Sequence, residues 1–426
     1  MKLRPYQEEG VAKLRAIYAS GRRAPVFCLP TGGGKTLVSV AIITGAIRLG
    51  RRVLFNAHRE ELIQQTADKL RAAGITNLRM IQAGRDGAAA PVTVASVQTL
   101  TRYSDAELPD ADLVIFDECH HVAAKTWRRI SDAYSKAWLL GLTASPQRAD
   151  GSPLGDVFDS MVVGATVKQL TELGHLVPCR VWAPPQILET GELAVSPVDA
   201  YLQHGQGERA ITFCVTKQHA ETTAAEFNAR GIPAAVVHGQ LSKMMRAQLL
   251  AWFREGQIRV ICNVHVLTEG FDDPAVAVCI LCRKPEHDGT YIQMAGRILR
   301  PAPGKTHATL IDLCGSSLSH GTPDMDREFS LDGKGIKKAD REQIRQCPSC
   351  GGVFLVQDME AGCCPQCGEE MPRREMKQPK AVGVGLVDAS NTDQLRINLL
   401  AVAKRTRRTP EWVDRAHAAI VGRRAG

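Results

Sequence analysis

The segment LPTGGGKT, residues 29–36, constrains the fold of this chain more than any other feature. It follows a short apolar run and precedes a helical pattern at 37–47. A loop of small residues there lets successive backbone N–H groups wrap a polyphosphate at a helix N-terminus. Lys35 would reach the β and γ phosphates, and the Thr36 hydroxyl would hold Mg²⁺. Leu29 departs from the general pattern, which has glycine there, but the alternative of a plain glycine-rich turn requires neither lysine nor threonine.

Short apolar, β-branched runs alternate with helical patterns twice along the first two-thirds of the chain, as is typical of parallel α/β architecture. The strands we expect are 26–29, 53–57, 92–96, 113–116 and 139–142, then 210–215, 234–237, 260–263, 276–281 and 309–313. Only the first copy carries a phosphate loop. The sequence therefore predicts an α/β fold with two tandem parallel-sheet lobes.

A second chemical signal is LVIFDECHH, residues 113–121, in the same lobe as the phosphate loop. Four apolar residues followed by Asp-Glu place two carboxylates at the C-terminal end of a buried strand, where α/β sheets bind ligands. Asp117 can bind Mg²⁺, and Glu118 can orient or deprotonate an attacking water.

Four cysteines have the spacing C-x₂-C-x₁₃-C-x₂-C, in the short loops CPSCGG and CPQCGE. Two tight turns of this kind present four thiolates tetrahedrally, so we expect a structural Zn²⁺ ribbon held by Cys347, Cys350, Cys364 and Cys367, rather than free thiols or disulfides. Cys363 is spare or replaces Cys364. The ribbon could bind nucleic acid, bind a protein partner or cap the rest of the chain, and the sequence leaves these open.

Six segments, taken together and in order, resemble the motifs of superfamily 2 helicases. PTGGGKT, DECH and GLTASPQR resemble motifs I, II and III, and RPYQ resembles the adenine-reading element. LTEGFDDP at 267–274 resembles motif V, and YIQMAGRILRP at 291–301 resembles motif VI. His120 and Gln293 stand where the DEAD-box RNA helicases have Asp and His, so the likeness is to the DExH repair-helicase and restriction-motor branch. The resemblance implies two RecA-like lobes.

The resemblance also implies roles for individual residues. It assigns catalysis to Lys35, Asp117, Glu118, Arg297 and Arg300. Nucleotide binding would involve Arg4, Tyr6, Gln7, Pro30, Thr31, Gly32, Gly33, Gly34, Lys35, Thr36, Asp117, Gly270, Asp272 and Gln293. Coupling to the nucleic-acid track is assigned to His120, Thr143 and Ser145. Contacts to the sugar–phosphate backbone are assigned to Arg59, Ser96, Gln98, Thr99 and His238, with helix capping by Ser96 or Thr99 and a plain turn at His238 as alternatives.

The two arginines also have a physical rationale. A guanidinium inserted at the γ-phosphate is worth roughly 10³–10⁵ in rate. An arginine from the other lobe makes ATP hydrolysis depend on closure of the two lobes. Hydrolysis is then coupled to movement of the lobes. The spacing Arg297-x-x-Arg300 predicts both on one helix face, and a solvated basic helix face is the alternative.

The domain organisation that we predict has seven consecutive parts. They are lobe 1 at 1–150, a linker or extension at 151–200, lobe 2 at 201–318, a linker at 319–339, the ribbon at 340–372, a linker at 373–390 and a basic helical tail at 391–426. From residue 334 onward the chain carries 17 Lys and Arg against 11 Asp and Glu, a basic excess that favours a polyanionic partner. In the tail, a Thr409–Pro410 helix start precedes Trp412, which could stack on a base or pack on the protein.

The function expected from the sequence is an ATP-dependent DNA helicase or translocase with ATP, Mg²⁺ and Zn²⁺. The alternatives are a duplex translocase without strand separation, an RNA helicase, and an ATP-gated scaffold. We expect nucleic acid as partner with DNA favoured, a monomeric motor, and a possible protein partner at the ribbon or tail. No apolar run approaches the ~20 residues of a membrane span, and the start lacks a signal-peptide h-region. A reducing cytoplasm is the expected location.

Overall fold

The structure is a computed structural model, which divides into two units, Met1–Met371 and Pro372–Gly426. The residues that it describes are 2–58, 60–83, 85–121, 124–146, 153–189, 191–267, 271–332, 344–371, 400, 409–411 and 413–414. Most of the basic tail, including Trp412, therefore lies outside the described residues, as do Arg59 and Gly270. No helix among the described residues is both long enough and apolar enough to cross a membrane.

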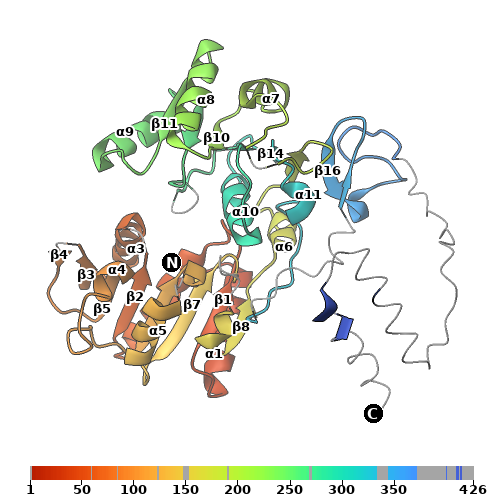
Figure 1. Ribbon diagram of the computed structural model, residues 1–426. Helices are drawn as coiled ribbons and strands as arrows, with labels where there is room; N and C mark the ends of the chain where they lie inside the picture. The colour runs from red at the N-terminus through yellow and green to blue at the C-terminus, as the bar shows by residue number, and fades with distance from the viewer. Residues whose placement is uncertain are drawn as a thin grey trace, which may run out of the picture. The chain divides into compact units, whose positions relative to one another are not determined.

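The first sheet has eight strands in the order β4-β3-β5-β2-β6-β7-β1-β8, and Figure 1 shows it running from β4 at the left to β8 at the right. Its strands are β1 Pro25–Cys28, β2 Val53–Ala57, β3 Leu78–Gln82, β4 Arg85–Asp86, β5 Val92–Ser96, β6 Leu113–Asp117, β7 Trp138–Thr143 and β8 Ser160–Val163. All neighbours pair in parallel except β3 and β4. Because the central strands are largely apolar and buried on both faces, helices must cover both sides.

Helices cover both faces of this sheet and, together with its strands, form two apolar cores. Those of the first part are α1 Pro5–Ala19, α2 Lys35–Arg48, α3 Glu60–Ala72, α4 Val97–Leu100, α5 Ala124–Ala133 and α6 Val167–Glu172, with 3₁₀ turns at Cys119–His121 and Leu154–Asp156. Alternate residues along β2 belong to opposite cores: Phe55 packs in one cluster and Leu54 in the other. The sheet is thus the central layer of a three-layer lobe, with its ligand-binding edge at the strand carboxyl ends.

The second sheet also has eight strands, in the order β11-β12-β10-β13-β14-β9-β16-β15. They are β9 Cys179–Trp182, β10 Ala210–Phe213, β11 Ala234–Val237, β12 Val260–Asn263, β13 Val278–Leu281, β14 Ala308–Asp312, β15 Ile344–Gln346 and β16 Gly352–Leu355. Its helices are α7 Pro197–His204, α8 Lys217–Ala229, α9 Lys243–Arg254, α10 Asp288–Ala295 and α11 Ser317–His320, with 3₁₀ turns at Gly296–Ile298 and Val356–Asp358. The six strands from β11 to β9 are parallel. The chain thus has two RecA-like parallel-sheet domains in an α/β fold, as the sequence predicts.

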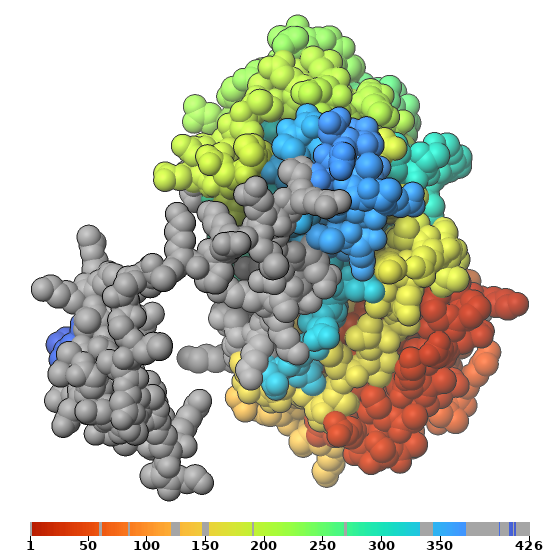
Figure 2. Space-filling view, turned by 90° about the vertical axis from the view of Figure 1, so that its right-hand side faces the viewer, coloured from red at the N-terminus to blue at the C-terminus, as the bar shows by residue number. Residues whose placement is uncertain are grey.

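The cysteine ribbon continues the second sheet. Strand β16 pairs antiparallel with β9, matching Gly352 to Trp182 and Val353 to Val181. Gln346 Nε2 reinforces this junction by donating a 2.6 Å hydrogen bond to Ala183 O. Figure 2 shows the ribbon, in blue, lying against the yellow-green residues around α7. The ribbon therefore covers the sheet edge that β9 would otherwise expose, a problem that sheet proteins commonly solve by pairing or capping the edge.

All ten strands predicted from the sequence are present, with ends shifted by at most a few residues. The strands that the sequence did not predict are β3, β4, β8, β9 and the two ribbon strands, which complete the sheets from short or partly polar segments. Strand β9 comes from the stretch expected to be a linker or extension, yet it is hydrogen-bonded between β14 and β16.

Candidate nucleotide site and metal centre

The phosphate loop connects β1 to α2 and depends on glycine. Gly32 and Gly34 have φ angles of 87° and 88°, in the left-handed region that favours glycine. At Gly33 a Cβ atom would lie 2.7 Å from Leu29 Cγ, which leaves no room for a side chain. Lys35 is the first residue of α2, and its Nζ donates a 3.2 Å hydrogen bond to Leu29 O. The loop thus forms a backbone cradle at a helix N-terminus.

The acidic pair lies at the carboxyl end of β6. Asp117 is the last residue of that strand, and Glu118 follows with a φ angle of 49°. A left-handed conformation is costly for a residue other than glycine, and such strain concentrates at functional sites. Lys35 Nζ lies 3.6 Å from Glu118 Oε1, and both side chains are largely buried. The structure therefore brings the loop lysine and the acidic pair together.

The N-terminal element contacts the same loop. Tyr6 Oη and Gln7 Nε2 each donate a 2.9 Å hydrogen bond to Gly33 O. Arg4 NH1 in turn donates to Tyr6 Oη at 3.3 Å. The ring of His175 lies 5.5 Å from the Tyr6 ring, and burial, followed by the nearby Arg4 charge, lowers the pKa of this histidine. His175 was not singled out from the sequence, where a lone histidine after α6 carries no signal.

A chain of hydrogen bonds joins the two sheets through His120. His120 Nδ1 lies 2.8 Å from Thr143 Oγ1, and Thr143 Oγ1 donates to Ser145 O at 2.7 Å. Because the Thr143 hydroxyl donates its proton to Ser145 O, it must accept a hydrogen bond from His120 Nδ1–H. His120 Nε2 is then an acceptor, and Gln293 Nε2 of α10 donates to it at 2.8 Å. The three proposed coupling residues and Gln293 thus form one connected, buried network.

Arg297 and Arg300 reach the cleft from the second sheet. Arg297 NH1 donates to Phe271 O at 2.9 Å, and Arg300 NH1 forms an ion pair with Asp272 Oδ1. Burial lowers the pKa of the Arg300 guanidinium, although the Asp272 charge opposes this. A Cβ atom on Gly32 would lie 3.1 Å from Arg300 Cγ, so the arginine stem crosses directly over the phosphate loop.

The prediction that both arginines share a helix face is wrong. Helix α10 ends at Ala295, Arg297 lies in the 3₁₀ turn that follows, and Arg300 lies beyond it. For Arg300, Pro301 gives the physical reason, because a proline disfavours the helical conformation of the residue before it. Both side chains nevertheless line the same cleft.

That cleft has a volume of about 350 Å³ and is lined by residues of both lobes. It is lined by Pro30, Thr31, Gly32, Gly34, Lys35, Thr36, Leu37, Leu62, Gln65, Lys69, Asp117, Glu118, Phe271, Asp272, Arg297 and Arg300. Leu62, Gln65 and Lys69 of α3 were not predicted, because nothing in an amphipathic helix marks which residues reach a cleft. The wall combines cations from both lobes with carboxylates, a lining suited to a metal-bound polyphosphate.

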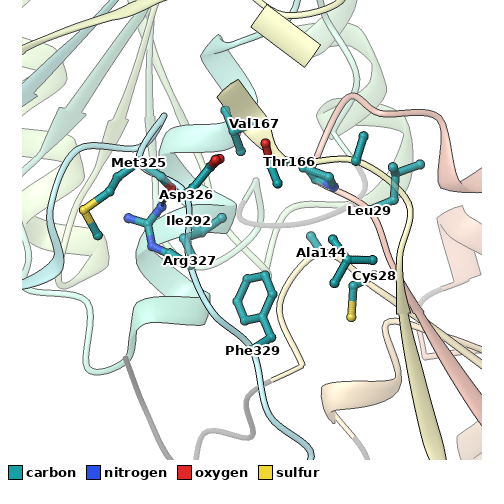
Figure 3. A pocket seen from close by; sticks show the side chains of 13 residues that line it. Cys28, Leu29, Ala144, Thr166, Val167, Ile292, Met325, Asp326, Arg327 and Phe329 are labelled. Carbon is teal, nitrogen blue, oxygen red and sulfur yellow. Dashed lines mark hydrogen bonds between the residues drawn. The ribbon is translucent and has the colours of Figure 1, made fainter. Parts of the chain in front are cut away.

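A small, mostly apolar cavity of about 40 Å³ lies beside the phosphate loop (Figure 3). Cys28 and Leu29 line it from the first sheet, Ile292 from α10, and Phe329 from the segment after α11. That segment returns to the first lobe, where Leu331 O accepts a 3.0 Å hydrogen bond from Gly155 N. The loop therefore rests on a junction of three parts of the chain.

The residues expected to contact nucleic acid lie at other strand ends. Ser96 Oγ donates to Gln98 Oε1 at 2.8 Å, and Gln98 Nε2 donates to His58 O at 2.8 Å. Ser96 begins α4 without a side-chain capping bond, so the capping alternative is not realised there. Thr99 lies within α4, and His238 follows β11, where its Nδ1 accepts from Gln240 N at 3.2 Å. Arg59 lies outside the described residues.

The cysteines of the ribbon form a compact cluster. The Sγ atoms of Cys347, Cys350, Cys364 and Cys367 all lie within 4.8 Å of one another. The distances Cys347–Cys367 and Cys350–Cys364 are 3.7 and 3.8 Å. Zn–S bonds of about 2.3 Å in a tetrahedron give S···S separations of roughly 3.8 Å, so these thiols fit a zinc ion. Cys363 points elsewhere, toward Ala361 O.

Comparison with known proteins adds the family. Residues 1–148 match the model of the type III restriction enzyme, res subunit, and residues 194–302 match that of the helicase conserved C-terminal domain. A 51.5 kDa protein of a Lactococcus phage is 31% identical over 81% of this chain and 78% of its own length. This chain belongs to the superfamily 2 helicases. A Schizosaccharomyces pombe protein, irc3, which carries the name of a mitochondrial ATP-dependent helicase, is 30% identical over 74% of this chain.

The helicase fold extends to solved structures. The type ISP restriction-modification enzyme LlaBIII, solved bound to DNA, superposes with a TM-score of 0.57 at 19% identity. The alignment covers 73% of this chain but 28% of that enzyme, and this chain spans 58% of irc3. The two family models match residues in the two lobes, so this chain is an enzyme of the ATPase and helicase class.

Proposed function

We propose that this helicase-family chain is an ATP-driven DNA motor, a helicase or translocase whose ATP hydrolysis is stimulated by nucleic acid. One observation carries the proposal: a single cleft is lined by Lys35 and Glu118 of the first lobe and by Arg297 and Arg300 of the second. Chemistry that requires groups from both lobes requires the lobes to be together, so each turnover can drive a cycle of closure and opening.

The first lobe would bind the nucleotide. The loop from Pro30 to Gly34 cradles the phosphates, and Lys35 exchanges its bond to Leu29 O for the β and γ phosphates. Mg²⁺, held by Thr36 and Asp117, supplies charge neutralisation when bound. Glu118 orients the attacking water and accepts its proton. Arg4, Tyr6 and Gln7, which contact Gly33 directly or through Tyr6, would read the adenine.

The second lobe would complete the site. Arg300 and Arg297 stabilise the negative charge that develops on the γ-phosphoryl group. Asp272 lines the cleft from the same side. We propose the same role for Gly270, which lies outside the described residues. Gln293 would couple closure of the lobes to His120, because their hydrogen bond exists only while the two lobes are in contact. Thr143 and Ser145 extend this connection toward the nucleic-acid track.

Nucleic acid would cross the strand ends that bear Arg59, Ser96, Gln98, Thr99 and His238. Amide, hydroxyl and guanidinium groups suit contacts to the sugar–phosphate backbone. The likeness to restriction enzymes favours DNA over RNA. We further propose that the chain acts as a monomer inside the cell, with Zn²⁺ in the ribbon and a protein partner at the ribbon or tail.

The experiment that tests the proposal measures ATPase activity in parallel with single-stranded DNA, duplex DNA, forked DNA and RNA. We expect DNA to raise kcat, and a strand-displacement assay beside a triplex-displacement assay separates unwinding from duplex translocation. The competing function is an ATP-gated scaffold, which would bind nucleic acid in an ATP-dependent way without stimulated turnover. ATP-dependent binding with flat ATPase rates on all four substrates would favour the scaffold.

A further inference from the structure

Lys305 lies in the turn that leads into β14, outside every motif identified in the sequence. Its Nζ donates hydrogen bonds to three backbone carbonyls: Val276 O at 2.6 Å, Arg300 O at 2.7 Å and Pro274 O at 3.0 Å. A lysine ammonium has three protons and no acceptor, so these carbonyls use its full donor capacity.

The three carbonyls come from the two segments that reach the nucleotide cleft. Pro274 and Val276 follow Asp272 closely, and Arg300 is itself a cleft residue. Arg300 and Asp272 form an ion pair with each other at the cleft wall. Lys305 therefore links the backbone of the segment that follows Asp272 to the backbone of Arg300.

Lys305 is partly buried, so its ammonium group is less solvated than that of a surface lysine. The pKa of the Lys305 ammonium is lowered to about 8; burial is the largest cause, and the Arg300 charge acts in the same direction. The groups that oppose this are Cys179, Asp273 and Glu208. Burying a charge costs free energy unless its hydrogen bonds are satisfied, so the three carbonyl bonds account for its being tolerated.

We infer that Lys305 is a positioning residue, which holds Arg300 and Asp272 in register with the polyphosphate of a nucleoside triphosphate bound to the first lobe. The inference rests on the proposed ATPase function. Without the brace, the register of the two segments would depend more on the ion pair between the exposed Asp272 carboxylate and the Arg300 guanidinium and on the hydrogen bond from Arg297 NH1 to Phe271 O. A shift of about 1 Å in a catalytic group can cost roughly 10²-fold in rate.

The test compares Lys305→Met, which removes every donor, with Lys305→Arg, which keeps a cation and several N–H groups. Lys284→Met is the matched control, because Lys284 also donates to a backbone carbonyl, Leu188 O, in the same part of the chain. We expect Lys305→Met to lower DNA-stimulated kcat at least about tenfold. Its affinity for a fluorescent ADP analogue should stay within about twofold of wild type, since the phosphate loop belongs to the first lobe.

A pH profile separates positioning from a general loss of structure. As pH rises through about 8, Lys305 loses a proton and keeps two donors for three carbonyls, so wild-type kcat should decline. Lys305→Arg stays protonated and should restore kcat and lack that decline. Wild-type kcat in Lys305→Met, or the same decline in Lys305→Arg, would overturn the inference alone. A wild-type chain with no DNA-stimulated turnover overturns the proposed function, and this inference with it.

Discussion

His120 and Gln293 lie 2.8 Å apart, Nε2 to Nε2, although one follows a strand of the first sheet and the other belongs to a helix of the second. A bond between a ring nitrogen and a carboxamide is short-ranged and directional, so it breaks as soon as the lobes separate. His120 also contacts Thr143, so a change at the lobe junction reaches the end of β7 through one imidazole.

The first prediction concerns this contact. Both His120→Ala and Gln293→Ala should lower the coupling between DNA binding and ATPase activity, seen as a smaller ratio of stimulated to basal rate. In a double-mutant cycle on kcat/KM the two losses should be non-additive, with an interaction of roughly 0.5–3 kcal/mol. Strictly additive effects would show that the residues act independently.

The phosphate loop gives the second prediction. Lys35→Ala should abolish ATP hydrolysis, because the variant removes the loop cation that would neutralise the β and γ phosphates. Steady-state ATPase with saturating DNA measures the loss. Lys13→Ala is a suitable control, since Lys13 pairs on the surface with Glu9 of the same helix. Activity near wild type in Lys35→Ala would remove the proposed site.

Glu118→Gln separates binding from chemistry. The amide keeps the shape of the side chain but cannot accept a proton from water, so turnover should be lost. ATP should still bind, measured by equilibrium fluorescence with a labelled analogue, because the loop and Lys35 are intact. Retained hydrolysis would assign the base to another group.

Arg300→Ala tests the contribution of the second lobe. We expect kcat to fall by about 10³-fold with little change in nucleotide affinity, since the guanidinium acts on charge that develops during phosphoryl transfer. Arg230→Ala removes a surface arginine that pairs with Asp199 and should leave kcat unchanged. A normal rate in Arg300→Ala would contradict the cross-lobe mechanism.

Zinc gives the fifth prediction. Purified protein should hold about one Zn²⁺ per chain, lost in Cys364→Ser, which should also lower the melting temperature. Cys363→Ser is the matched control, because the neighbouring thiol lies outside the cluster. Elemental analysis and thermal denaturation measure both effects. Equal zinc content in the two variants would mean that the ribbon holds its metal differently.

The sequence predicts the parallel core of both sheets because those strands are largely continuous apolar runs, such as Val260–Asn263. Short runs of this kind are typical of strands buried on both faces. The sequence does not predict β9 and β16, because their pairing joins residues about 170 positions apart, such as Val181 and Val353. Short strands carry no local pattern that indicates a distant partner.

Within the site, the loop and the acidic pair were predictable because phosphate and metal chemistry demand particular residue types in particular order. The hydrogen-bonded network at His120 was not, since it depends on how two lobes meet. His175 and Lys305 illustrate the same point: each has a defined contact, with Tyr6 and with Arg300 O, but no motif distinguishes either from an ordinary surface residue.

Strand β9 has a further consequence. One of its edges pairs with β14, and the other pairs with the ribbon. If the four thiols bind the expected metal and then lose it, and the ribbon unfolds, a row of backbone donors and acceptors becomes free on a folded, apolar sheet. A chain in that condition would be prone to stick to its own copies before it lost its catalytic lobes, so metal depletion should appear first as self-association.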